Sequence, residues 1–342
     1  MKTTLEQLAA TQDVLLADGA TGTNLFTAGL ETGYPPELWN VERPEAIAAL
    51  YQQFVDSGSD IILTNSFGGT SFRLKLHQSE GRVAELNIAG ARLAREVADK
   101  AERPVLVAGS VGPTGELFAP LGMVTDKDAE AAFTEQAEAL AAGGVDVIWI
   151  ETMSSLEEVH AAAKASKKMG LPVMATMTFD TAGRSMMGVK PADFKMFVAE
   201  IDLQGFGANC GIGPAELIDS VSYFDAADQE RFVIAKGNCG IPAYVDGKIH
   251  YHGTPELMAE YALIARDLGV RIIGGCCGTK PEHLAAMRAA LESTPKGAPP
   301  SKQEITNRLG VAWKSLAEKP ATDAKAGRER RRRRGDRCRS AS

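Results

Sequence analysis

The sequence predicts a single (β/α)8 barrel, and three observations support this fold. Eight short runs rich in apolar and β-branched residues recur between residues 14 and 278, which is the pattern of buried strands. The segments between them have helical spacing, and several close on a glycine that suits a helix C-terminus, as in residues 44–58 and 131–144. Eight strands that alternate with helices match a closed parallel barrel.

Each predicted strand corresponds to one of these runs. An open, doubly wound sheet is the alternative fold, but the glycines that follow Leu16 lack the G-x-G-x-x-G spacing that such a sheet ordinarily shows after its first strand. The eight runs span residues 14–20, 60–67, 105–112, 146–153, 173–180, 205–211, 232–240 and 271–278.

The composition indicates a globular protein of a reducing compartment. With 44% hydrophobic and 24% charged residues, the chain can bury a large core. No apolar stretch approaches the roughly 18 residues that span a bilayer, and the N-terminus carries Glu6 and Asp13 instead of a signal-like apolar run. The 5 cysteines are too few and too irregularly spaced for a disulfide framework. We therefore expect a cytoplasmic protein with free thiols and no membrane partner.

We expect a barrel domain over residues 1–292 and a largely disordered tail over residues 293–342. The tail is rich in Pro, Lys, Ser and Ala and ends in an arginine cluster between Arg328 and Arg339. Such a segment buries too little apolar surface to offset its chain entropy. The net charge of −7 does not indicate nucleic acid as a partner of the whole chain. RNA association through the tail is kept as an alternative function.

Polar residues at the carboxyl ends of the predicted strands are the candidates for a functional site, because these ends form the active face of a (β/α)8 barrel. They are Asp18, Thr64, Asn65, Ser110, Glu151, Cys210, Asn238, Cys239, Cys276 and Cys277.

Three of these cysteines predict a zinc site. Cys276 and Cys277 lie between glycines that let the backbone bend, so that two consecutive side chains can converge. Together with Cys210 they can fill three corners of a tetrahedron and leave the fourth open for a substrate, as in catalytic zinc sites. Cys239 is an alternative zinc ligand, less favoured than these three cysteines. A free cysteine can also be a small buried hydrophobe, but three at strand ends beside glycines favour a metal.

The strand-end segments DGATGT, IETM, NCGIGP and GGCCGT together resemble the homocysteine S-methyltransferase family. The resemblance covers residues 14–291. It implies a zinc ion bound by Cys210, Cys276 and Cys277, with Asn238 as a possible fourth ligand when substrate is absent. Homocysteine would bind zinc as its thiolate and attack the methyl group of a donor.

The resemblance also implies roles for residues around the metal. Glu151 would receive the ammonium group of homocysteine, and Asp18 with Gly19 would form the turn that approaches the amino acid. Glu151 and Asp18 are thus the expected catalytic residues. A structural role is the alternative for each: an internal salt bridge for Glu151, and bracing of the glycine turn for Asp18.

The methyl donor is expected to be a small onium compound. Trp39 stands in the loop after the first strand, where an aromatic face attracts a quaternary ammonium or sulfonium, and Tyr34 and Phe67 could complete a cage. Packing of Trp39 under the loop is the alternative. Glycine betaine is the expected donor. Animal betaine enzymes of the family carry a tyrosine where Thr152 stands, so their particular betaine pocket is not expected here. S-methylmethionine, dimethylsulfoniopropionate and a methyl-corrinoid protein are alternative donors. A different enzyme class, a lyase with Lys236 as a Schiff base, is the remaining alternative.

Overall fold

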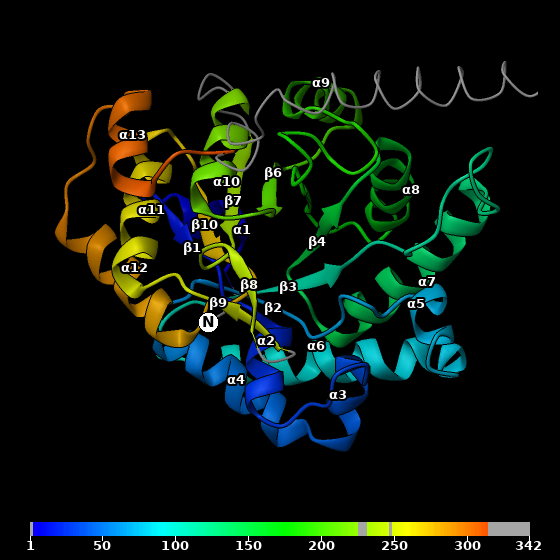
Figure 1. The fold of residues 1–342 in the computed structure, drawn as a ribbon. Coiled ribbons are helices and arrows are strands. Elements are labelled where there is room, and N and C mark those ends of the chain that lie inside the picture. The colour runs from blue at the N-terminus through cyan, green and yellow to red at the C-terminus, as the bar shows by residue number, and fades with distance from the viewer. Residues whose placement is uncertain (1–2, 225–230, 246–247, 314–342) are drawn as a thin grey trace, which may run out of the picture.

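A computed structural model describes residues 3–224, 231–245 and 248–313. Within these residues, eight parallel strands form one sheet in the order β1-β10-β7-β6-β5-β4-β3-β2, and a bridge between Ala17 and Ile61 joins β1 to β2 and closes it (Figure 1). The (β/α)8 barrel is confirmed, and every predicted run contains one strand. The strands are β1 (Leu15–Leu16), β2 (Ile61–Leu63), β3 (Leu106–Val111), β4 (Val147–Met153), β5 (Val173–Met177), β6 (Gly205–Cys210), β7 (Phe232–Gly237) and β10 (Ile272–Gly275).

Helices surround the barrel and alternate with its strands (Figure 1). They are α1 (Leu5–Ala9), α2 (Thr21–Thr27), η1 (Pro36–Leu38), α3 (Trp39–Glu42), α4 (Pro44–Asp56), α5 (Ser71–Lys75), η2 (Glu80–Arg82), α6 (Val83–Lys100), α7 (Asp126–Gly143), α8 (Leu156–Lys167), α9 (Pro191–Ile201), α10 (Pro214–Val221), η3 (Ser222–Phe224), α11 (Pro255–Asp267), α12 (Pro281–Ser293) and α13 (Lys302–Leu309). No described helix combines the length and the apolar character needed to cross a lipid bilayer.

Two apolar layers hold the barrel together. Side chains of a strand point alternately to its two faces, so every second residue enters the barrel interior. In β4, Val147 and Trp149 belong to the inner cluster, whereas Ile148 and Ile150 belong to the layer between strands and helices. Helix α1 contributes Leu5, Leu8 and Ala9 to the inner cluster. The interior is therefore a packed core, on which the polar residues at the strand ends rest.

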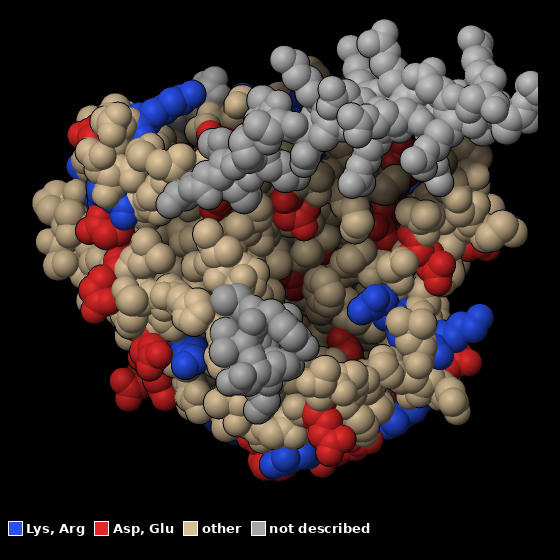
Figure 2. Space-filling view, viewed as in Figure 1, with Lys and Arg blue, Asp and Glu red and all other residues tan. Residues whose placement is uncertain are grey.

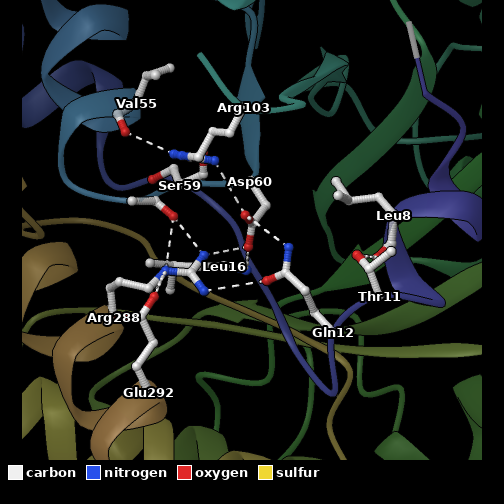
Figure 3. A network of polar contacts seen from close by, with 11 residues as sticks. Leu8, Thr11, Gln12, Leu16, Val55, Ser59, Asp60, Arg103, Arg288 and Glu292 are labelled. Atoms are coloured by element: carbon white, nitrogen blue, oxygen red, sulfur yellow. Dashed lines mark hydrogen bonds and ion pairs between the residues drawn. The ribbon is translucent and has the colours of Figure 1, made fainter. Parts of the chain in front are cut away.

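The seam between β1 and β2 is closed by carboxylates as well as by backbone. Asp60 N–H donates to the Leu16 carbonyl at 2.6 Å, and Leu16 N–H donates back to Asp60 Oδ2 at 2.8 Å. Arg288 from α12 and Arg103 also contact the Asp60 carboxylate, as Figure 3 shows. These arginines further donate to loop carbonyls, including that of Ser59. One buried carboxylate thus fastens β1, β2, α12 and the segment before β3.

Two features differ from the expectations. A hairpin of β8 (Pro242–Val245) and β9 (Lys248–Tyr251) follows β7 and was not predicted, although an Asp-Gly dipeptide in that segment is a hairpin signal. The second feature is the chain after the expected boundary at residue 292, because residues 294–313 pack against the barrel.

The packed segment after α12 is held by side-chain contacts. Arg266 in α11 donates to the carbonyls of Thr294 and Pro295, Arg308 in α13 pairs with Glu260, and Trp313 Nε1 donates to Asp219 at 2.8 Å. Its composition concealed these contacts, since they rest on main-chain carbonyls and a few apolar side chains. The remainder of the predicted tail, with its arginine cluster, lies outside the described residues.

We predict that Asp60→Ala lowers the free energy of unfolding by at least about 2 kcal/mol, because two arginines lose a buried partner and the Leu16 N–H loses its acceptor. Urea unfolding measures the change. Asp56→Ala, at the exposed end of α4, is the matched control and should stay within about 0.5 kcal/mol of the wild type. Equal effects of the two substitutions would contradict the seam's role.

Candidate metal centre and substrate cavity

The inward-facing positions change from apolar to polar at the carboxyl ends of the strands. Two residues beyond inward Ala108, Trp149 and Ile234, the same face carries Ser110, Glu151 and Lys236. By the same parity Asn209, the next-to-last residue of β6, and Cys276, directly after β10, lie on this face. The polar floor of the candidate site is therefore a continuation of the barrel's own side-chain alternation.

Three cysteine sulfurs meet above this floor. The Sγ atoms of Cys210, Cys276 and Cys277 all lie within 4.8 Å of one another, and those of Cys210 and Cys277 are 3.7 Å apart. Two thiolates on one tetrahedral zinc, each at about 2.3 Å, are separated by about 3.8 Å. The spacing and the all-sulfur donor set therefore fit a zinc ion.

The backbone bends to bring the cysteines together. Cys210 has φ 61°, a left-handed conformation that is costly for a residue with a side chain, and Gly278 after the cysteine pair has φ 80°. Strand parity alone would point Cys210 and Cys277 away from Asn209 and Cys276. These turns at the strand ends accompany their convergence on one centre.

The three thiols lie close enough to hydrogen-bond to one another, so a proton can be shared between two sulfurs. Hydrogen bonds from Cys210 and Cys276 lower the pKa of the Cys277 thiol well below its ordinary value, whereas hydrogen bonding to Cys276 and Cys277 raises the pKa of Cys210. A dication held by all three sulfurs would take the place of the shared protons, as metal binding to thiols requires.

The other two candidate ligands lie differently. Cys239 is buried, and its Sγ donates to the Gly253 carbonyl at 3.4 Å, outside the cluster of three. Asn238 donates through Nδ2 to the Gly211 carbonyl at 2.6 Å, while its buried Oδ1 has no partner among the described residues. Asn238 thus keeps an unused acceptor next to the segment that carries Cys210.

Glu151 is a buried carboxyl that faces the cavity. Ser110 Oγ donates to Glu151 Oε1 at 2.5 Å, and Ser110 is itself held because its N–H donates to Thr64 Oγ1 at 3.0 Å. Burial raises the pKa of Glu151 to about 7, although the charge of Lys236 and the hydrogen bond from Ser110 oppose this rise. Its charge state therefore changes near neutral pH.

Asp18 and Lys236 form a buried ion pair. Lys236 Nζ lies 2.7 Å from Asp18 Oδ1, and Leu63 N–H donates to Asp18 Oδ2 at 2.7 Å, so both carboxylate oxygens have partners. Burial lowers the pKa of Lys236, but the charges of Asp18, Glu151 and Cys276 outweigh it, and its pKa lies above the ordinary value. Lys236 lines the cavity, whereas Asp18 supports it from behind.

Asn209 organises the end of β4. Its Oδ1 accepts from Thr152 N–H at 2.8 Å, and its Nδ2 donates to Thr152 Oγ1 at 2.7 Å. Thr152 has φ 60°, a left-handed conformation that this pair of bonds stabilises directly after Glu151. The Asn209 amide also lies 3.9 Å from Cys276 Sγ. Asn209 therefore links the acidic and the cysteine parts of the site.

These residues border a cavity of about 490 Å³, within the range of small-molecule pockets. Figure 2 shows this face of the molecule hollowed near its centre. The predicted residues that line the cavity are Gly19, Tyr34, Thr64, Asn65, Phe67, Ser110, Glu151, Cys210, Cys276 and Cys277. Trp39 does not line it. That side chain is buried in the core with the Arg43 guanidinium over its ring at 4.6 Å, so packing under the loop is what the structure shows.

Asn209 did not enter the predicted set of site residues, whereas Ser110 was a strand-end candidate without a role and Lys236 was considered only as a Schiff base. Counting every second residue along β6 places Asn209 on the inner face with Gly205 and Gly207, and this signal could have found it. Hydrogen bonds between strands, such as those that join Asn209 and Thr152, could not be predicted from the sequence pattern.

The chain is similar in sequence to two methionine synthases. The chain is 29% identical over 328 residues to methionine synthase of Mycobacterium leprae, which covers 90% of this chain and 27% of that protein. It is 30% identical over 298 residues to methionine synthase of Mycobacterium tuberculosis, which covers 82% of this chain and 25% of that protein. The chain thus spans about a quarter of the length of these relatives.

Solved structures give the same picture of the fold. The metallated form of the homocysteine methyltransferase MmuM from Escherichia coli superposes with a TM-score of 0.70 at 24% identity, over 83% of this chain and 99% of that one. The oxidized form of the same enzyme superposes with a TM-score of 0.71. The family model described as homocysteine S-methyltransferase matches residues 15–291, nearly the whole barrel. The chain therefore belongs to the homocysteine S-methyltransferase family.

Proposed function

We propose that this protein transfers a methyl group from a small onium donor to the sulfur of L-homocysteine and that it depends on zinc. The observation that carries the proposal is the group of three cysteine sulfurs within 4.8 Å of one another, in the same cavity as Glu151. Membership of the homocysteine S-methyltransferase family supports the acceptor and the reaction.

Cys210, Cys276 and Cys277 would hold the metal. When bound, zinc would supply one chemical effect: it would keep the homocysteine sulfur deprotonated at neutral pH, where a free thiol is mostly protonated. Three protein ligands leave one position for that sulfur. Asn238 Oδ1 has no partner among the described residues and is a candidate for this position when homocysteine is absent.

Glu151 would hold the homocysteine ammonium group. Ser110 fixes one of its carboxyl oxygens, so the other remains available to accept a charge-assisted hydrogen bond. Asp18 would act indirectly, because both of its oxygens are engaged by Lys236 and Leu63. Gly19, which lines the cavity, has no side chain to obstruct the amino acid. These groups position the sulfur for in-line attack and exclude water.

The donor would bind in the outer part of the cavity. Tyr34 and Phe67 line it and offer aromatic faces to a cation, whereas Trp39 does not reach it. Glycine betaine is the leading donor, with S-methylmethionine, dimethylsulfoniopropionate or a methyl-corrinoid protein as alternatives. The geometry disfavours a Schiff-base lyase, because Lys236 is ion-paired with a raised pKa and a protonated amine is not a nucleophile.

We predict that Cys276→Ala loses zinc and methyl transfer together. Zinc content should fall well below one equivalent per chain, and methionine formation from homocysteine should fall at least about a hundredfold, because two sulfurs cannot complete the site. Metal analysis and product assay on one preparation test this. Cys239→Ala removes a buried thiol outside the cluster and should keep both zinc and activity. A metal-free Cys276→Ala protein with wild-type activity would refute the proposal.

Homocysteine binding should weaken as pH falls through about 7, the pKa to which burial raises Glu151. Above this pKa Glu151 is a carboxylate that attracts the ammonium group, and below it the charge is lost. Between about pH 8 and pH 6 the KM for homocysteine should rise roughly tenfold more than the KM for 4-mercaptobutanoate, which lacks the amino group. Glu151→Gln should abolish this difference. The same pH dependence for both thiols would assign the titration to another group.

A further inference from the structure

Glu37 is a buried carboxyl that forms no ion pair in the described part of the chain, although the charges of Arg73 and His77 act on it from farther away. It is 4% exposed, and its Oε1 accepts from Gly68 N–H at 2.6 Å. No Lys, Arg or His nitrogen among the described residues lies within ion-pair distance of it. Burial raises the pKa of Glu37, while hydrogen bonds from its own backbone N–H and that of Gly68 favour the charged form. A buried charge in proteins ordinarily has a partner.

A cationic ligand has a place to bind beside Glu37, because Glu37 lines the cavity described above. Phe26, Tyr34 and Phe67 line the same cavity and are 36% to 48% exposed, so their ring surfaces are available to a ligand. A carboxylate combined with aromatic rings is the surrounding that an onium group prefers, because the cation gains from the negative charge and from the ring faces. Trp39 was expected to bind the cationic group of the donor, and Glu37 is placed in the cavity to take over that role.

Arg73 is the complementary charge at this cavity. It lies in α5, is half-buried and lines the cavity, and no carboxylate among the described residues pairs with its guanidinium. The charge of Arg73 lowers the pKa of Glu37, yet the two side chains form no ion pair. A guanidinium that is not paired within the protein is suited to a ligand carboxylate.

We propose that Glu37 and Arg73 form a donor subsite for zwitterionic onium compounds, in which Glu37 with Tyr34 and Phe67 takes the cationic end and Arg73 takes the carboxylate. The inference rests on the proposed function and narrows its substrate class. Onium compounds without a carboxylate, such as choline, would bind weakly. In the transfer, the homocysteine sulfur forms a bond to the methyl carbon while the bond from that carbon to the donor's onium atom breaks. Its electron pair leaves with the donor, which becomes neutral at that atom.

Four ligands of nearly one shape test the two charges separately. Glycine betaine carries both charges, choline only the cation, 3,3-dimethylbutanoate only the carboxylate, and 3,3-dimethyl-1-butanol neither. Calorimetric titration of the full chain with each ligand, without homocysteine, measures binding when no methyl acceptor is present. Glu37→Gln keeps an acceptor for Gly68 N–H and removes the charge, and Arg73→Gln removes the other charge. Glu45→Gln and Lys75→Gln change exposed charges on the neighbouring helices α4 and α5 and serve as controls.

Glu37→Gln should weaken glycine betaine and choline roughly tenfold or more and leave the two uncharged-head ligands within about twofold. Arg73→Gln should weaken glycine betaine and 3,3-dimethylbutanoate by a similar factor and spare the other two. The controls should bind all four ligands as the wild type does. Uniform losses, or none, would overturn the subsite, as would a wild-type protein that binds none of the four.

Two further outcomes keep the test decisive. If Glu37→Gln does not fold, the wild-type preference for choline over 3,3-dimethyl-1-butanol decides the cationic end, and equal binding refutes it. The failure of the proposed function looks different: the charge pattern would hold, but homocysteine with glycine betaine or the other donors would give no methionine. Methionine formation with binding that ignores charge would refute the subsite alone.

Discussion

The Asp18 carboxylate is the contact on which both the barrel and its site depend. One oxygen accepts from Leu63 N–H across the seam between β1 and β2, and the other holds Lys236 at 2.7 Å across the barrel interior. Since β1 and β2 share only a single bridge, this bond and the one from Leu16 to Asp60 complete the closure. Removing the carboxylate would weaken the seam and leave Lys236 as a buried cation without its partner.

Lys236 links the Asp18 carboxylate to the candidate site, because it pairs with Asp18 and lines the cavity. Its charge lies among the buried Asp18, Glu151 and the cysteine sulfur of Cys276, so one lysine balances several acidic groups. The cavity that it lines is bordered by the three cysteines and Glu151, and also by Glu37 and the aromatic side chains. We propose that Glu151 positions homocysteine and that Glu37 and Arg73 select the donor.

Much of this arrangement could be predicted from the sequence, because strands of a barrel repeat with period two and end in polar residues at one face. The eight strands and the convergence of Cys210, Cys276 and Cys277 follow from that pattern and from the neighbouring glycines. The orientation of loop residues could not be predicted: Trp39 packs inward under Arg43, while Glu37, two residues earlier, faces the cavity. Which side of a short 3-10 turn faces a ligand depends on tertiary packing and leaves no periodic signal.

In the proposed site, the homocysteine sulfur would join the sulfurs of Cys210, Cys276 and Cys277 on one zinc ion. X-ray absorption at the zinc edge tests it most directly, because it counts the sulfur atoms around the metal. We expect three sulfurs and one lighter ligand at about 2.0 to 2.3 Å without homocysteine, and four sulfurs after it is added. A count that does not change on adding homocysteine, or two or fewer sulfurs in the starting protein, would contradict it.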